Sequence, residues 1–276
     1  MISCKEYVQI EKERLKEQIK DFERKPMLYI FQVGNDDASN RYTRWKKKDC
    51  DEVGIEYEHV HLPENITTEE LRYEIVMKQH LIDTDGIIIQ LPLPEHIDAD
   101  EVTELIYSRT DVDGFTVGSP YDPCTPKGIV DWLEYNNIDF NGKVVTVLGR
   151  SKIVGKPLVN MLIDRGAMVI NCNSKTDRED IINAFNISEI VISAIGKPRY
   201  WEKWDFLDSQ KARILVDVGI NTDENGELCG DFDEGCESML IGPDAHQTPV
   251  PGSVGLLTRL SLLKNVVKAH EENPYG

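Results

Sequence analysis

The stretch KVVTVLGRSKIVGKP, at residues 143–157, decides how this chain folds. Residues 143–148 form an apolar, β-branched run without a hydrophilic face, which is typical of a buried parallel strand. Apolar residues then recur at helical spacing at Leu158, Met161 and Leu162, and Gly166 follows where a helix C-cap glycine is expected. The pattern predicts a strand, a glycine turn and a helix, which together form one unit of a parallel sheet.

The turn itself predicts a phosphate-binding loop. A glycine turn between a strand and a helix directs backbone N–H groups and the positive end of the helix dipole toward a pyrophosphate. The spacing is not the common G-x-G-x-x-G, because a serine stands where the second glycine is expected. The strand before the loop and the helix after it strengthen the prediction of a dinucleotide cofactor, held by Gly149, Arg150, Ser151 and Gly155.

Composition restricts the class of protein. A chain of 276 residues that is 40% hydrophobic can bury one large core or two moderate ones, and we expect two domains. Its 31 basic and 49 acidic residues give a net charge of −18, which disfavours binding to nucleic acid or to an anionic membrane. Basic residues nevertheless cluster at 41–48 and at 150–156, so an anionic small substrate is compatible with the sequence.

Cysteine spacing and hydropathy predict the compartment. The six cysteines lie far apart without a C-x-x-C pair, so neither a structural metal site nor a secreted disulfide framework is indicated. The first 23 residues are charged and helical in pattern, and no apolar run approaches the ~20 residues that span a bilayer. We expect a cytoplasmic protein without a metal.

Strand-like and helix-like runs alternate along the chain, which predicts an α/β fold of parallel βαβ units. Helices are expected at 1–23, 39–53, from 67 onward and from 256 onward; strands are expected at 27–33, 55–62, 86–91, 143–148, 168–171, 189–194 and 214–219. A turn-rich passage at 111–127 separates two halves, and we place the domain boundary within it, between residues 118 and 119.

Six motifs in order resemble one family. They are VGNDDASNRY at 33–42 running on to Lys46, QLPLP at 90–94, DVDGF at 111–115, PCTP at 123–126, GRSKIVGKP at 149–157 and TPVPG at 248–252. Together they resemble the bifunctional methylenetetrahydrofolate dehydrogenase/methenyltetrahydrofolate cyclohydrolase family of FolD-type folate enzymes. An ordered set of this kind is much more specific than any single motif.

The resemblance implies both a reaction and an architecture. The reaction is oxidation of 5,10-methylenetetrahydrofolate to the 5,10-methenyl form with a nicotinamide cofactor, followed by hydrolysis to 10-formyltetrahydrofolate. The architecture is an N-terminal folate domain at 1–118, a Rossmann-like domain at 119–255 and a C-terminal helix at 256–276 that returns to the first domain. The resemblance also implies a homodimer, tetrahydrofolate derivatives as ligands, and a place in one-carbon metabolism and purine biosynthesis.

Two residues on one helix face are candidates for the hydrolytic step. Lys46 follows Tyr42 by four positions, so on a helix both side chains project from one face. Spacing alone would make Lys46 one of three solvated lysines. By resemblance, Lys46 is catalytic and helps water add to the methenyl carbon, and Tyr42 lines the pterin.

The other catalytic candidates follow strands or lie in turns. Gln90 ends an apolar strand and would ordinarily face solvent, whereas by resemblance it orients Lys46 beside the substrate contact Leu91. Asp113 lies in a D-V-D-G turn. A carboxylate has two oxygens that match the 2-amino group and N3–H of a pterin, and we assign Asp113 to that contact by resemblance.

The loop at 248–255 would by default be a stiff connection between domains. By resemblance it lines the folate site, which adds Pro251, Gly252 and Gly255 to the substrate contacts. The sequence departs from the family pattern at four positions: Ser253 stands for a glycine, Leu256 for a proline, Thr110 for a lysine and Asn173 for a histidine.

The choice of cofactor depends on the strand at 169–172. An NAD site usually offers an acidic residue to the ribose diol, whereas an NADP site offers basic and hydroxyl groups to the 2′-phosphate. No acid follows this strand, and Arg150, Ser174 and Lys175 are available. The sequence therefore favours NADP and leaves NAD open. By resemblance, Ile220 packs near the nicotinamide.

Two alternatives remain at this stage. One is a dehydrogenase with a weak or lost cyclohydrolase step, and the other is a nucleotide-binding protein without catalysis. Both are disfavoured by the presence of Lys46, Gln90 and Asp113, because neither needs a lysine and a glutamine beside a pterin-binding aspartate.

Overall fold

A computed structural model describes residues 1–207, 209 and 211–275. The chain divides into two compact units. The first unit comprises residues 9–124 and 259–276, and the second comprises residues 1–8 and 125–258. The C-terminal helix thus belongs from residue 259 onward with the N-terminal half of the chain, as the family resemblance implied. The finer domain ranges 1–118, 119–255 and 256–276 stay a prediction.

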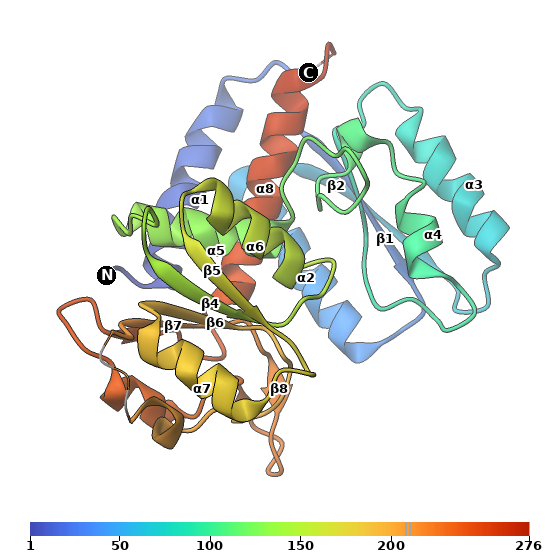
Figure 1. Ribbon diagram of the computed structural model, residues 1–276. Coiled ribbons are helices and arrows are strands. Elements are labelled where there is room, and N and C mark those ends of the chain that lie inside the picture. Colours follow the sequence, from blue (N-terminus) through green and yellow to red (C-terminus); the bar gives the residue numbers. More distant parts are fainter. Residues whose placement is uncertain (208, 210, 276) are drawn as a thin grey trace. The chain divides into compact units, whose positions relative to one another are not determined.

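The first unit is built on a parallel sheet with the strand order β2-β1-β3. Its strands are β1 (Met27–Val33), β2 (Glu56–Leu62) and β3 (Gly86–Ile89). Its helices are α2 (Asp37–Val53), α3 (Thr68–Gln79), α4 (Ala99–Thr103), the 3-10 turn η1 (Ser108–Thr110), and most of α1 (Cys4–Lys20) and α8 (Val254–Glu272). Strands β1 and β2 are labelled in Figure 1.

Local signals set the ends of these helices. The side chain of Asp36 accepts a hydrogen bond from the Ser39 N–H and begins α2, and Gly54 ends that helix in the left-handed conformation. Thr67 and Glu70 form a reciprocal capping box at the start of α3. The start of α2 lies two residues before the expected one and its end is as expected, whereas α1 is three residues shorter than expected at each end.

The two faces of the first sheet have different partners. Tyr29, Phe31 and Val33 alternate along β1 and pack with Leu71 and Ile75 of α3 in a buried cluster that also includes a residue of α4. Figure 1 shows α3 and α4 on the same side of this sheet. On the opposite face, the hydroxyl of Thr43 in α2 donates to Gln32 Oε1 at 3.0 Å. The period of two along β1 thus separates an apolar face from one that contains a polar contact with α2.

The second unit contains a five-stranded parallel sheet with the order β10-β7-β6-β4-β5. Its strands are β4 (Val144–Leu148), β5 (Met168–Cys172), β6 (Ile190–Ser193), β7 (Ile214–Asp217) and β10 (His246–Gln247), with a hairpin of β8 (Asn221–Thr222) and β9 (Leu228–Cys229). Its helices are α5 (Cys124–Tyr135), α6 (Gly155–Asp164) and α7 (Arg178–Ile187), with 3-10 turns η2 (Lys203–Phe206) and η3 (Glu234–Met239).

This strand order places the chain's predicted loop at a topological switch point. The chain runs from β4 to β5 on one side and then crosses to β6 on the other. Ligands of such sheets bind beyond the carboxyl ends of the strands at that reversal. On one face of the sheet, Phe185 of α7 stacks on Phe206 with ring centroids 4.7 Å apart, within a cluster that also includes Trp201 and Leu215.

The α/β class, the parallel pairing and the seven expected strands are confirmed. The sequence pattern did not predict α4, α5, α7, the hairpin of β8 and β9, or the short strand β10, which lies in a segment rich in proline and glycine at 243–255. Within the part of the chain that the structure describes, no helix has the length and apolar character needed to cross a membrane.

Candidate active site

The loop between β4 and α6 requires both of its glycines for steric reasons. Gly149 has a φ of +110°, and a Cβ atom there would lie 2.7 Å from the Ala194 carbonyl oxygen at the end of β6. A Cβ on Gly155 would lie 2.7 Å from the Cα atom of Arg150. The loop therefore folds back tightly on the first turn of α6, and backbone rather than side chain faces the end of the sheet.

Ser151 replaces the usual second glycine and has a role within the loop. Its hydroxyl accepts hydrogen bonds from the N–H groups of Val154 at 3.2 Å and Gly155 at 3.3 Å. Val154 precedes α6 and offers no side-chain cap. The serine thus satisfies N–H groups at the start of the helix and orders the loop.

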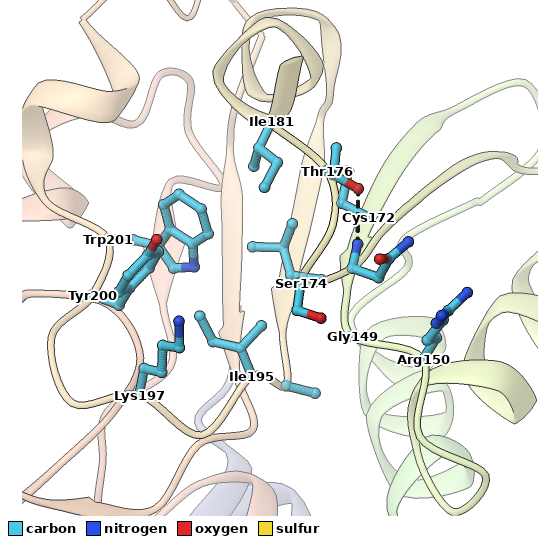
Figure 2. Close-up of a pocket in the computed structure, with 13 residues that line it drawn as sticks. Gly149, Arg150, Cys172, Ser174, Thr176, Ile181, Ile195, Lys197, Tyr200 and Trp201 are labelled. Carbon is cyan, nitrogen blue, oxygen red and sulfur yellow. Dashed lines mark hydrogen bonds between the residues drawn. The ribbon is translucent and has the colours of Figure 1, made fainter. Parts of the chain in front are cut away.

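A cavity of about 300 Å³ lies at the carboxyl ends of β4, β5 and β6. Figure 2 shows Arg150 on one side of this cavity, Lys197 and Tyr200 on the other, and Ser174 between them. None of the described residues that line it is acidic. The lining residues Gly149, Arg150, Lys197 and Ser174 supply an exposed backbone, two cations and a hydroxyl, which fit a dinucleotide with an additional phosphate.

Most of the residues that line this cavity were not assigned from the sequence, among them the polar residues Thr176, Lys197 and Tyr200. Thr176 accepts a hydrogen bond from the Asn173 N–H at 3.1 Å (Figure 2), and the Lys197 ammonium lies 4.5 Å from the ring centroid of Tyr200. Lys197 and Tyr200 follow the predicted strand at 189–194, so the rule that ligands bind at the carboxyl ends of parallel strands could have indicated them.

A buried carboxylate fixes the loop that follows β6. Asp231 accepts hydrogen bonds from the N–H groups of Ile195 and Lys197, both at 2.9 Å, and from the hydroxyl of Ser193 at 2.8 Å. The pKa of the neighbouring Asp217 is raised to about 7, mainly by burial. Hydrogen bonds from three backbone N–H groups to its carboxylate oppose this rise. The segment that ends at Lys197 is therefore held rigidly beside the cavity.

The remaining residues assigned to the second unit lie on two segments. Ile220 is 48% exposed, and a Cβ on Gly255 would lie 3.7 Å from its Cδ1 atom, so these two positions are neighbours. Pro251 and Gly252 belong to the loop before α8, where the Val250–Pro251 peptide is cis. Of the departures from the family pattern, Ser253 donates to the Pro249 carbonyl at 2.6 Å and so closes this loop.

In the first unit, Lys46 and Gln90 meet. Lys46 Nζ lies 3.1 Å from Gln90 Oε1, across 44 positions of sequence. Gln90 is buried, with 8% exposure, and its amide donates to the Leu91 carbonyl at 2.7 Å. The solvent-facing alternative for Gln90 is therefore wrong, and the neighbouring Lys47 is directed elsewhere, with its Nζ 2.7 Å from His59 Nδ1.

Asp113 lies within electrostatic reach of Lys46. Burial raises the pKa of Asp113, the positive charge of Lys46 opposes this, and the negative charge of Asp111 adds to it. A hydrogen bond with the thiol of Cys124 also lowers the pKa of Asp113. The result is a partly buried carboxyl group beside a lysine and a thiol, the last of which sequence reasoning did not assign.

Tyr42 projects from α2 one turn before Lys46. It is partly buried, which raises the pKa of its hydroxyl, and its ring lies edge-on to Trp45 with centroids 5.6 Å apart. The guanidinium of Arg259 lies 5.2 Å from the ring centroid of Trp45. Tyr42, Trp45 and Arg259 therefore lie together in one cluster.

The fold and these two groups of residues define a class of α/β enzymes with two units. The first unit carries a lysine, a glutamine and an aspartate, and the second is a Rossmann-type cofactor unit. Comparison with known families is more specific. Residues 2–113 match the catalytic domain of tetrahydrofolate dehydrogenase/cyclohydrolase, and residues 123–274 match its NAD(P)-binding domain. The chain belongs to this family, and the resemblance noted in the sequence is confirmed.

Individual relatives agree with this membership. The chain is 38% identical to the bifunctional protein FolD of Agathobacter rectalis over 273 residues, which cover 94% of each chain. The crystal structure of the bifunctional FolD dehydrogenase/cyclohydrolase from Campylobacter jejuni has a TM-score of 0.89 and 36% identity, over 98% of both chains. The Trypanosoma brucei enzyme, solved with NADP and an inhibitor, has a TM-score of 0.88 and 28% identity, over 99% of this chain and 97% of that one.

Proposed function

We propose that this protein oxidises 5,10-methylenetetrahydrofolate to 5,10-methenyltetrahydrofolate with NADP and hydrolyses the methenyl form to 10-formyltetrahydrofolate. The observation that carries the proposal is the Lys46–Gln90 contact beside Asp113 in a chain of this family. A protein that only bound a nucleotide would not need a lysine held by a buried amide in its other unit. The alternative of a dehydrogenase without a hydrolytic step lacks a specific observation in its favour.

The residues of the first unit have separate parts in this proposal. Asp113 binds the pterin through its two oxygens, and Tyr42 with Leu91 lines the ring. Lys46 Nζ exchanges a proton with the water that adds to the methenyl carbon. Gln90 fixes the direction of the ammonium group through its Oε1 atom and is itself fixed by the Leu91 carbonyl. Pro251, Gly252 and Gly255 complete the proposed substrate contacts.

The second unit would hold the cofactor. Gly149 and Gly155 let backbone approach the pyrophosphate, Ser151 orders the loop, and Ile220 would contact the nicotinamide. When bound, the nicotinamide accepts a hydride from the methylene carbon of the substrate. The described residues that line the cavity include no acidic side chain, which supports NADP rather than NAD, because a carboxylate would repel a 2′-phosphate.

Family membership supports three finer proposals. We infer that the enzyme works as a homodimer, that it is cytoplasmic, and that its 10-formyl product supplies one-carbon units for purine biosynthesis. A spectroscopic assay tests the reaction itself: methylenetetrahydrofolate is mixed with NADP or NAD, and reduced cofactor and methenyl absorbance are followed together. Formation of reduced cofactor without any transient or final methenyl signal, and without 10-formyl product, would contradict the proposal.

Arg150→Ala is expected to raise the KM for NADP by roughly 10- to 150-fold, the range for loss of one charge-assisted hydrogen bond, and to change the KM for NAD much less. The reason is that the guanidinium lines the cavity beside Ser174, where it can contact a 2′-phosphate. Steady-state kinetics with both cofactors measure the effect. Lys156→Ala is the matched control, because Lys156 is an exposed cation of the same loop region that does not line the cavity. A wild-type preference for NAD would contradict this assignment and leave the dehydrogenase activity intact.

The loss of activity at low pH should reflect protonation of the Asp113 carboxylate. Its carboxylate form is the one that accepts two pterin N–H donors, and burial raises its pKa. The value of kcat/KM for methylenetetrahydrofolate should therefore fall as the pH decreases, with a midpoint above the ordinary aspartate value of about 3.9. Lys46→Met should move this midpoint to higher pH, because the Lys46 charge lowers the pKa of Asp113. An unchanged midpoint in Lys46→Met would show that another group controls the acid side.

A further inference from the structure

A buried amide on α8 contacts the segment that carries Asp113. Asn265 is 2% exposed. Its Nδ2 atom lies 2.9 Å from the Val112 carbonyl oxygen and 3.2 Å from the Asp122 carbonyl oxygen. Since an amide nitrogen carries two N–H donors, both are used on backbone carbonyls of two different segments.

Both of these segments hold groups next to the Asp113 side chain. Val112 immediately precedes Asp113 in the chain. The thiol of Cys124, two residues after Asp122, has one S–H, which donates to the same Val112 carbonyl at 3.3 Å or to the Asp113 carboxyl group. Asn265 Nδ2 lies 3.7 Å from this sulfur. One amide thus contacts the backbone on the N-terminal side of Asp113 and the thiol that contacts its carboxyl group.

The helix that carries Asn265 is itself held firmly within the first unit. Arg259 Nη1 lies 2.9 Å from Asp49 Oδ2 toward one end of this part of α8. Toward the other end, His270 Nδ1 lies 3.0 Å from Asp85 Oδ2, and Asp85 also receives two hydrogen bonds from Arg24 at 2.8 Å. A donor on this helix therefore has a fixed position, which a positioning residue requires.

We propose that Asn265 is a positioning residue for Asp113, which from α8 fixes the direction in which the carboxylate meets the pterin. The inference rests on the proposed function, because it needs Asp113 to bind substrate. Loss of the amide would release the Val112 carbonyl to a single weak thiol donor and leave the Asp122 carbonyl without this partner. The Asp113 segment would then sample several conformations in the free enzyme. Substrate binding would weaken, because it would have to order this segment and so lose conformational entropy.

The test uses Asn265→Leu, which keeps the volume and removes both donors, and Asn265→Ser, which keeps one smaller donor and guards against a failure of the leucine variant to fold. The expected result is a rise of roughly tenfold in the KM for methylenetetrahydrofolate with Asn265→Leu, a smaller rise with Asn265→Ser, and an unchanged KM for NADP. Val266→Ala is the control, because Val266 is the next residue of the same helix, is fully buried and has no side-chain donor. Thermal unfolding of all variants measures how much each change destabilises the fold.

The outcomes separate this inference from the proposed function. If Asp113→Ala raises the KM for folate while Asn265→Leu and Asn265→Ser raise it no more than Val266→Ala does at a similar loss of stability, the positioning role is wrong and the proposed function stands. If Asp113→Ala itself leaves the KM for folate unchanged, the pterin contact fails and the role of Asn265 fails with it. Equal rises in the KM values for folate and NADP would indicate a general loss of structure and would overturn the inference.

Discussion

Lys46→Met should decrease the rate of methenyltetrahydrofolate hydrolysis by at least about 100-fold, the lower range for loss of a proton-transfer group, while methylenetetrahydrofolate oxidation continues at an appreciable rate. Hydride transfer depends on alignment of substrate and cofactor, whereas addition of water needs a group that exchanges a proton. Methenyltetrahydrofolate should therefore accumulate during oxidation. Its absorbance, followed with that of the reduced cofactor, measures both steps in one sample.

Two neighbouring lysines give matched controls for this variant. Lys48→Met removes an exposed cation two residues further along α2, and Lys47→Met removes the ammonium that contacts His59. Both should hydrolyse methenyltetrahydrofolate at rates close to that of the wild type, because neither ammonium is held by Gln90. Wild-type hydrolysis by Lys46→Met would disprove the assigned role, and equal losses in all three variants would point to helix stability instead.

Asp113→Ala should impair oxidation and hydrolysis together, because one pterin contact serves two successive reactions on the same ligand. Loss of a hydrogen bond to a charged group typically costs about 1.5–3 kcal/mol, which corresponds to a decrease of roughly 10- to 150-fold in kcat/KM for each activity. Asp113→Asn should be nearly as impaired despite its similar size, because its amide places a donor opposite a pterin donor.

A nearby carboxylate gives the control for the Asp113 variants. Asp122→Ala removes an exposed acid close in sequence and leaves the backbone carbonyl that Asn265 contacts. It should retain both activities and both KM values. If Asp113→Ala also retained them, another group would have to bind the pterin.

The local features of this protein were predictable because their signals lie within a few residues of each other. The apolar run at 143–148, the two glycines and the helical spacing after them specify β4, its loop and α6, since each depends on contacts between near neighbours in sequence. The caps at Thr67 and Gly54 are signals of the same short range, whereas α2 begins two residues before the expected start because Asp36 caps it. The family motifs identified Lys46, Gln90 and Asp113 as candidate residues of the catalytic site.

Some features of the candidate site had no local signal. Ser151 was expected as a deviation from the glycine pattern, and only the folded loop shows that its hydroxyl accepts two N–H groups. Lys197 and Tyr200 follow a strand without a motif, and their place in the cavity depends on β6 lying next to β4. The strand β10 is only two residues long, so it has no sequence pattern that could predict it. It is a strand because it pairs with β7.

The sequence by itself determined the alternation of strands and helices, the phosphate-binding loop and the family to which the chain belongs, because these depend on residue type and short spacing. Only the tertiary structure decided which groups meet. Lys46 reaches Gln90 across 44 positions, and Asn265 reaches Val112 across 153. Such contacts arise when separate strands and helices pack to bury their apolar faces, so the polar groups that meet are set by the geometry of packing and not by any spacing along the chain.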